Sequence, residues 1–172
     1  GPQLTLVSKS ISTDGVPQNN NVGVNKSTST LSVTYNLKIK ALGGTLTFGN
    51  VASGTPLFAS STASFGIYRN GSYDASIGSY ATSTSYTIPS TCVAEATAKN
   101  GCTLAEGAEI TIPVTWQILG RTRDDGGAIP SGSVWSVGFE GITWFNATTG
   151  LPQRTDFMAT TTDWRTADVS FP

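Results

Sequence analysis

Residues 108–119, AEITIPVTWQIL, alternate between apolar and polar side chains along their whole length. The apolar positions are Ala108, Ile110, Ile112, Val114, Trp116 and Ile118, and the polar face holds Glu109, Thr111, Pro113, Thr115 and Gln117. Successive side chains of a β-strand point to opposite faces of the sheet, so the pattern predicts a strand with one buried face and one wet face. We expect it to be the central strand of a two-layer β domain.

Further strands are expected along the rest of the chain. Residues 31–41 show the same alternation, with apolar side chains at Leu31, Val33, Tyr35, Leu37, Ile39 and Ala41. Shorter segments predict strands at 4–11, 45–48, 64–69, 86–88, 134–145 and 164–171. Ser and Thr exceed a quarter of the chain, whereas the helix formers Leu, Glu and Lys are scarce. The sequence therefore predicts an all-β fold, a two-layer antiparallel β-sandwich of about eight strands, with a closed barrel as the alternative.

Four local features predict where these strands bend or turn. The apolar phase changes at residues 6–7, which predicts a β-bulge or a crossing between sheets, and again at 140–141, which predicts a β-bulge. The Asn-Gly pair at 70–71 is expected to end a strand. The Gly-Gly pair at 43–44 predicts a hairpin turn, after which residues 45–48 return as a short strand.

A single domain is expected over residues 1–172, because one core suffices for this length and no linker divides the chain. Gly1 and Pro2 resemble the remnant of a cleaved tag, which indicates a piece of a longer protein. The net charge of −1 and the charged fraction of 12% predict no nucleic-acid partner. No apolar run approaches the roughly 18 residues of a spanning helix, so no membrane insertion of this fragment is expected. The oligomeric state is left open.

The two cysteines, Cys92 and Cys102, flank a segment in which Asn100-Gly101 supplies a turn. We predict a disulfide between them, because both lie in what reads as a polar loop that offers free thiols little burial. Two free buried thiols in a cytosolic protein are the alternative. A bridge over so short a loop contributes roughly 2–3 kcal/mol in the chain-entropy estimate. A disulfide also indicates an oxidising compartment, and we expect an extracellular or cell-surface location.

No catalytic residues are predicted. The chain has no histidine, which excludes Ser-His and Cys-His nucleophile systems and most zinc sites. Glu140 with Asp124 or Asp125 is the one carboxylate pair that we considered for a glycosidase, and such pairs arise in many proteins without function. We expect no enzymatic activity and no cofactor.

Two groups of residues were weighed as binding sites. Asp124 and Asp125, followed by two glycines, are weak candidates for a Ca²⁺ site, and a solvated turn is the favoured interpretation because the full calcium-loop pattern is missing. The region between residues 69 and 86 sets tyrosines among Ser, Gly and Asn, a composition that suits contact surfaces. Tyr73, Tyr80 and Trp164 form the candidate binding surface, and the favoured alternative is that some of the tyrosines of this region simply pack on the edge of the sandwich. The other tryptophans follow the inward phases of their strands and are expected in the core.

Four segments resemble known proteins: LSVTYNLKIKALGGTLTF, TPLFASSTASFGIYRNGS, TLAEGAEITIPVTWQI and VWSVGFEGITWF. Together they are similar to Ig-like domains of secreted bacterial cell-surface proteins of the stalk or adhesin type. The resemblance extends over roughly residues 31–145 and lies in a long Val/Thr-alternating strand, an acidic turn before a TIPVTW strand, and a Gly-containing aromatic strand. It implies an Ig-like sandwich in a stalk or adhesion role, and it brings no catalytic residues.

Three functions follow as hypotheses. The first is a non-enzymatic structural or adhesive module of a larger extracellular or cell-surface protein, which presents its loops to a protein or glycan partner. The second is a carbohydrate-binding module, in which Tyr73, Tyr80 or Trp164 stacks on sugar rings. The third is a surface-fibre subunit, in which residues 4–11 pair with a neighbouring copy by strand addition.

Overall fold

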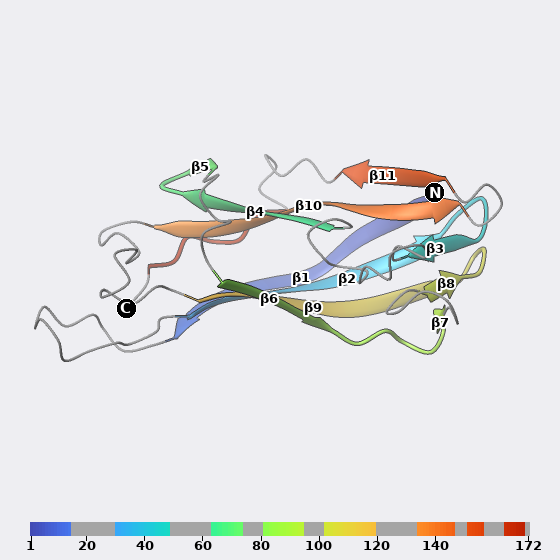
Figure 1. Ribbon diagram of the computed structural model, residues 1–172, viewed down its shortest axis with the longest axis horizontal. Coiled ribbons are helices and arrows are strands. Elements are labelled where there is room, and N and C mark those ends of the chain that lie inside the picture. The colour runs from blue at the N-terminus through green and yellow to red at the C-terminus, as the bar shows by residue number, and fades with distance from the viewer. Residues whose placement is uncertain are drawn as a thin grey trace, which may run out of the picture.

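The computed structural model describes residues 1–14, 30–48, 63–73, 81–94, 102–119, 134–146, 151–156 and 164–170. The regular elements of these residues are all β-strands, arranged in two antiparallel layers (Figure 1). The strands are β1 Pro2–Asp14, β2 Thr30–Ala41, β3 Leu46–Phe48, β4 Ala63–Arg69, β5 Ser72–Tyr73, β6 Ala81–Tyr86, β7 Val93–Ala94, β8 Cys102–Leu104, β9 Glu109–Leu119, β10 Trp135–Asn146 and β11 Pro152–Asp156. The predicted all-β sandwich is confirmed.

The first sheet has the strand order β1-β2-β9-β6. Strands β2 and β9 pair continuously from Thr30↔Leu119 to Lys40↔Glu109. The alternating apolar residues of both strands are buried in the core, while their polar partners line the outer face, where Thr34 and Thr115 share a hydrogen bond of 3.0 Å. The prediction that residues 108–119 form an interior strand with a buried even-numbered face is confirmed.

The second sheet contains seven strands around β10. Ile142 pairs with Ala63 of β4 and also with Thr155 of β11, so these two strands lie on opposite edges of β10. Trp144 likewise pairs with β3 and β11, which places β3 beyond the end of β4 on the same edge. Strand β5 extends the sheet past β4, and β8 and β7 extend it past β3.

One core fills the space between the sheets. Aromatic rings meet across it: Tyr35 of β2 lies 5.4 Å from Phe139 of β10, and Phe65 of β4 stacks on Trp116 of β9 at 4.9 Å between ring centroids. The disulfide-bonded cysteines and the buried residues of both sheets belong to the same apolar cluster. The two layers are therefore held by a shared core.

The predicted bulges and the Asn-Gly turn are confirmed. The pairing of β1 with β2 shifts between Leu6 and Ser8, which leaves Val7 as the extra residue, 57% exposed. The pairing of β10 with β4 shifts between Phe139 and Gly141. At residues 70–71 both backbone φ angles are positive, 51° and 84°, as a two-residue hairpin turn of type I′ requires.

Residues 45–48 do not form the predicted hairpin with the strand that precedes them. Strand β3 pairs with β8 and β10 in the second sheet. Both edges of β2 are already occupied, by β1 and β9, so a returning strand has no place beside it. The positive φ angles of the glycines at 43–44, 72° and 154°, instead let the chain cross from one layer to the other.

Two other strand predictions need correction, and some predicted loops lie outside the described residues. The strand expected at 86–88 is β6, which ends at Tyr86 and begins at Ala81. The final segment, 164–170, makes two isolated bridges to β10, Trp135↔Val169 and Gly138↔Arg165, and no continuous strand. The predicted connections at 49–62 and 121–133 lie outside the described part of the chain.

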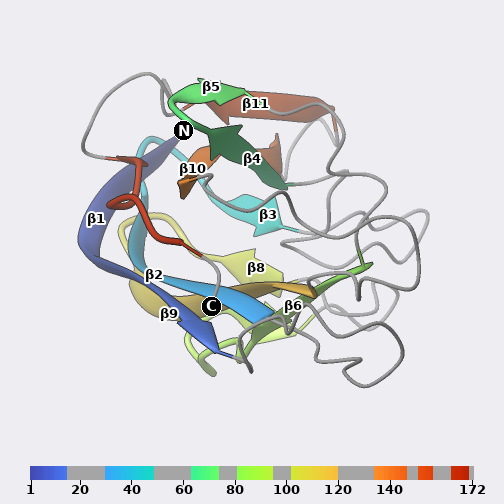
Figure 2. The ribbon, with the colours of Figure 1, turned by 90° about the vertical axis from the view of Figure 1, so that its left-hand side faces the viewer.

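The two ends of the described chain lie at opposite ends of the sandwich. Gly1 sits beside the β2–β3 turn, where its amine donates to the carbonyl of Leu42 at 2.8 Å. Ser170 lies next to the far end of β1, because its carbonyl accepts from the Thr13 hydroxyl at 3.0 Å. At about 3.3 Å per residue, β1 separates these points by roughly 35 Å. Figure 2 shows the C-terminal segment beside β1, between the two layers.

Candidate functional site

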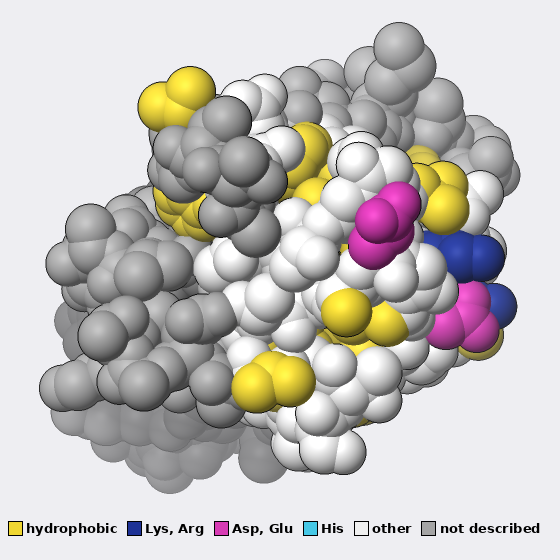
Figure 3. Space-filling model, turned by 90° about the vertical axis from the view of Figure 1, so that its right-hand side faces the viewer, with side chains coloured by type: hydrophobic (Ala, Val, Ile, Leu, Met, Phe, Trp, Pro, Cys, Tyr) yellow, Lys and Arg dark blue, Asp and Glu magenta, His cyan; other side chains and the backbone are white. Residues whose placement is uncertain are grey.

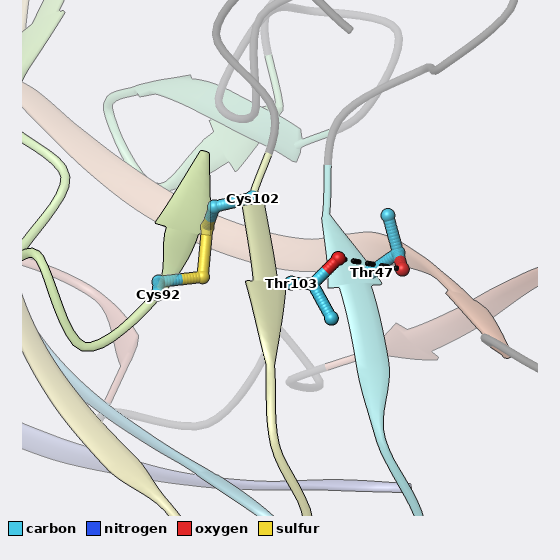
Figure 4. Close-up of a disulfide and its surroundings, with 4 residues drawn as sticks. All are labelled: Thr47, Cys92, Cys102 and Thr103. Carbon is cyan, nitrogen blue, oxygen red and sulfur yellow. Dashed lines mark hydrogen bonds between the residues drawn. A yellow bond between two sulfur atoms is a disulfide. The ribbon is translucent and has the colours of Figure 1, made fainter. Parts of the chain in front are cut away.

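The predicted disulfide between Cys92 and Cys102 is present, with a sulfur–sulfur distance of 2.05 Å. Its surroundings differ from the expected polar loop, because both cysteines are buried in the core and Cys102 belongs to β8 (Figure 4). The disulfide therefore lies in a buried apolar environment, and not in the exposed polar loop that the sequence suggested. On the other side of β8, the Thr103 hydroxyl lies 3.3 Å from that of Thr47 across the β3–β8 pair. The sulfurs are sealed inside the protein, so the disulfide serves structure.

Four side chains gather on the outer face of the second sheet, and we call them the tyrosine–arginine cluster: Tyr68, Tyr73, Glu140 and Arg165. The rings of Tyr68 and Tyr73 meet edge to face with centroids 5.8 Å apart. The guanidinium carbon of Arg165 lies 3.7 Å from the centre of the Tyr68 ring. Tyr68 is 9% exposed and Tyr73 is 56% exposed, so the cluster has a buried base and an accessible ring at its rim.

Two glycines make room for this cluster. Gly66 of β4 and Gly138 of β10 are register partners, so the sheet carries no side chains at this point of its outer face. A Cβ atom at Gly66 would collide with the carboxylate of Glu140, which lies directly over it. Arg165 pairs with Gly138 at the opposite edge of β10, and its Nη2 donates to the carbonyl of Gly71 at 3.3 Å. The arginine therefore reaches from the C-terminal segment to the β4–β5 turn.

The electrostatics of the cluster concern the Tyr68 hydroxyl. Burial raises the pKa of Tyr68, and the Glu140 carboxylate, which also accepts its hydrogen bond, raises it further. The nearby Arg165 charge acts in the opposite direction on the same pKa. Nε of Arg165 is buried and has no hydrogen-bond partner among the described residues. The cluster thus holds a neutral phenol between one anion and one cation.

Of the predicted binding-surface residues, Tyr73 and Trp164 do not come together. Trp164 is partly buried and packs against the core, with its ring 6.2 Å from that of Phe139. Tyr73 stands on the outer face of the second sheet, so the two rings lie on opposite sides of that layer. Tyr80, the third candidate, lies outside the described residues.

The sequence interpretation did not anticipate Arg165. Tyr68 directly precedes the tyrosine-containing region at 69–86, and Glu140 stands at the predicted bulge of 140–141. Arg165 approaches Tyr68 only because the C-terminal segment pairs with β10, a contact between distant parts of the chain. No local pattern marks such a contact, so no sequence signal identified this residue.

The other candidate sites can be placed only in part. Asp124 and Asp125 lie outside the described residues. The weak prediction of a calcium site and the carboxylate pair with Glu140 therefore both stay predictions. Within the described ranges, no three His, Cys, Asp or Glu side chains gather as metal ligands would. Of the tryptophans expected in the core, Trp116 and Trp135 are buried, and Trp144 is partly buried against the core.

The fold defines the class of this protein as an all-β, two-layer antiparallel sandwich. No protein-family model, curated protein or solved structure matches the chain. Within the described residues, no helix has the length and apolar character needed to cross a membrane. The buried disulfide is compatible with an extracellular protein.

Proposed function

We propose that this domain is a non-enzymatic structural or adhesive module of a larger extracellular or cell-surface protein. The observation that carries the proposal is where the first and last described residues of the chain lie. Gly1 and Ser170 lie at opposite ends of β1, roughly 35 Å apart by strand rise. A module of this shape adds its full length to a protein when it is joined to neighbours at both ends, which is what a stalk or spacer requires.

The disulfide supports an extracellular setting for the module. Disulfides persist in oxidising compartments and are rare in the cytosol, where thiols are kept reduced. The bond between Cys92 and Cys102 closes a short loop at the β7–β8 end of the second sheet, and its sulfurs are shielded by the core. Such a bond stabilises the folded domain in a compartment where disulfides persist.

The surface at the N-terminal end of the molecule supports a spacer as well. Exposed apolar side chains there stand in small separate groups among polar atoms (Figure 3). Within the described chain, the large exposed hydrophobic residues are Val7, Leu42, Tyr73, Val93, Val134 and Leu151. Isolated apolar residues of this kind are ordinary on soluble surfaces. Among its described residues, this end therefore presents no large apolar face to a neighbouring module.

A tandem protein tests the spacer proposal. One, two and three copies of the 172-residue chain joined end to start should show a maximum dimension, by small-angle X-ray scattering, that grows with each copy by roughly the 35 Å of β1 or more. Three copies that are no longer than one would contradict the proposal. Binding of the single domain to cells or matrix proteins then tests whether the module is also adhesive.

A carbohydrate-binding function is the second candidate, and the exposed ring of Tyr73 favours it. Aromatic rings stack on the apolar faces of sugars, and the tyrosine–arginine cluster that contains Tyr73 also holds Glu140 and Arg165, whose polar groups suit sugar hydroxyls. A panel of polysaccharides, read by tryptophan fluorescence and calorimetry, tests it. Binding that survives Tyr73→Phe and disappears with Tyr73→Ala would support this site, and no binding to any member would count against it.

The fibre-subunit alternative has no comparable support. Strand β1 pairs with β2 of its own chain over twelve residue pairs, and Leu4, Leu6 and Ile11 pack against the core. A neighbouring copy would have to pair with the outer edge of β1, which is the edge strand of the first sheet, or replace β2 as its partner. Size-exclusion chromatography of the chain with and without residues 1–14 tests the idea, and a folded monomer in both cases would exclude it.

A further inference from the structure

We infer that the fold is built to carry tension along its long axis, with β1 and the C-terminal segment 164–170 both loaded in shear. The inference rests on the proposed spacer function, because a module in a stalk is pulled through its two ends. It adds a mechanical property that a spacer need not have. The three parts of the load path are the N-terminal strand, the C-terminal segment and the contacts that connect them.

At the N-terminal end, tension acts along the direction of a long paired strand. Strand β1 runs the length of the sandwich from Gly1 toward Thr13 (Figure 1). Its hydrogen bonds to β2 are perpendicular to the strand, so a pull on Gly1 along the axis strains the whole ladder together. Sliding β1 by one residue would also turn Leu4, Leu6 and Ile11 away from the core. The strand therefore resists displacement as a unit.

At the C-terminal end, the loaded segment is short but is held in several ways. It runs antiparallel to β10, and Val169 and Trp135 exchange two backbone hydrogen bonds of 2.7 and 2.8 Å. Thr166 binds the backbone of Val137 through both its amide and its hydroxyl, each at 2.9 Å. The Trp164 ring is inserted against the core, next to Phe139.

Arg165 anchors the same segment to the outer face of the second sheet. Its side chain passes from the β10 edge across Gly138, lies on the Tyr68 ring at 3.7 Å and donates to Gly71 at 3.3 Å. Trp164 and Arg165 are adjacent in sequence, and their side chains therefore pack on opposite faces of the second sheet. A pull on the segment must break both attachments, one in the core and one on the surface.

Two contacts connect the N-terminal and C-terminal parts of the path. The Tyr35 hydroxyl of β2 donates toward the carbonyls of Val137 and Trp164, at 2.9 and 3.1 Å, which joins the first sheet to β10 and to the C-terminal segment. The Thr13 hydroxyl donates to Ser170 at the far end of β1. Load applied to β1 thus reaches the C-terminal segment through contacts in the middle of the molecule and at the far end of β1.

Single-molecule pulling in two geometries tests the inference on the full 172-residue chain. In the first, handles are attached at the two termini. In the second, one handle stays at the N-terminus and the other is inserted in the turn at residues 42–44, which lies beside Gly1. The second geometry opens the same β1–β2 ladder one pair at a time. We expect the end-to-end unfolding force to be several-fold higher, and equal forces in the two geometries would overturn the inference.

Variants of the C-terminal anchor give a second readout. Arg165→Met, which removes the guanidinium from Tyr68 and Gly71, should lower the end-to-end force and leave the force in the second geometry unchanged. Lys38→Met is the control: the Lys38 backbone belongs to the loaded β1–β2 ladder, but its exposed side chain pairs with Glu109 of β9, so the substitution removes a contact that joins neither β1 nor the C-terminal segment. A drop with Lys38→Met equal to that with Arg165→Met would also count against the inference. The tandem experiment fails or succeeds separately: copies can add their lengths while showing no difference between pulling geometries.

Discussion

Tyr35 has the largest side chain among the fully buried residues, and its polar atom connects the two layers. Its hydroxyl lies within hydrogen-bond distance of the Val137 and Trp164 carbonyls. Tyr35→Phe removes this donor and keeps the ring, so we expect a loss of about 1 kcal/mol of unfolding free energy at neutral pH. Urea denaturation measures it. Buried Phe139→Leu serves as a comparison, because it removes ring packing and no hydrogen bond.

The same residue predicts how stability responds to alkali. Burial raises the pKa of Tyr35, so the folded protein keeps a proton that the unfolded chain releases above pH about 10. Titration of Tyr35 leaves the unfolding free energy unchanged below that pH. Above it, the unfolding free energy falls by up to about 1.4 kcal/mol per pH unit. Denaturation at pH 9 to 11.5 should show a steeper decline for the natural protein than for Tyr35→Phe. The same decline of stability with pH in both proteins would contradict a raised pKa of Tyr35 in the folded state.

A second residue-scale prediction concerns Gly66. An alanine there would displace the Glu140 carboxylate and break its hydrogen bond with Tyr68. We expect Gly66→Ala to cost about 1–3 kcal/mol and to move the pKa of Tyr68 back toward its ordinary value, because the negative charge moves away. In a Glu140→Ala background the substitution should cost less, since the obstacle is gone. An identical cost in both backgrounds would show that Glu140 is not the obstacle.

At the scale of elements, local pattern predicted some strands well. Strands β2 and β9 were predicted with their inward residues, because each has one face on a core and one in water, and the alternation records this directly. The bulges at Val7 and Glu140 broke the same alternation and were therefore visible. The alternation within a strand shows which of its faces is buried, and that information is enough to predict these strands and their bulges.

The residue pattern within a strand does not determine which other strands pair with it. Residues 45–48 suggested a hairpin, yet the edges of β2 were taken by strands from residues 2–14 and 109–119, which a local pattern cannot foresee. The tyrosine–arginine cluster was missed for the same reason, because Arg165 meets Tyr68 across 97 positions of sequence. Of the candidate surface, Tyr73 could be picked from local composition, and its partners could not.

The disulfide gives a prediction at the element scale. Cys92→Ala with Cys102→Ala should lower the unfolding free energy by about 2–5 kcal/mol. Roughly half reflects the freedom that the unfolded loop regains, and the rest reflects the loss of two buried sulfurs from the core between β7 and β8. Urea denaturation of the variant and of the natural protein measures the difference. Equal stabilities would mean that the bond contributes nothing to the fold.

For the whole molecule, the two sheets have to be stable together. Neither layer has a core of its own, since each buries its apolar face against the other, as Tyr35 does on Phe139 and Phe65 does on Trp116. The N-terminal strand belongs to the first sheet and the C-terminal segment to the second, so the chain also connects the layers at both ends. A domain divided between its sheets would lose its apolar core in both halves.

Unfolding should therefore be a single transition that both sheets share. A variant that keeps Trp116 and replaces the other tryptophans by Phe reports on the first sheet through fluorescence, and one that keeps only Trp144 reports on the second. In each variant the fluorescence midpoint in urea should equal that of far-ultraviolet circular dichroism, which follows all strands. Fluorescence and circular dichroism that separate in either variant would show that one layer survives without the other. Shared unfolding is also what tension along the axis requires, because a load that enters through β1 and leaves through residues 164–170 can be borne only while both layers are intact.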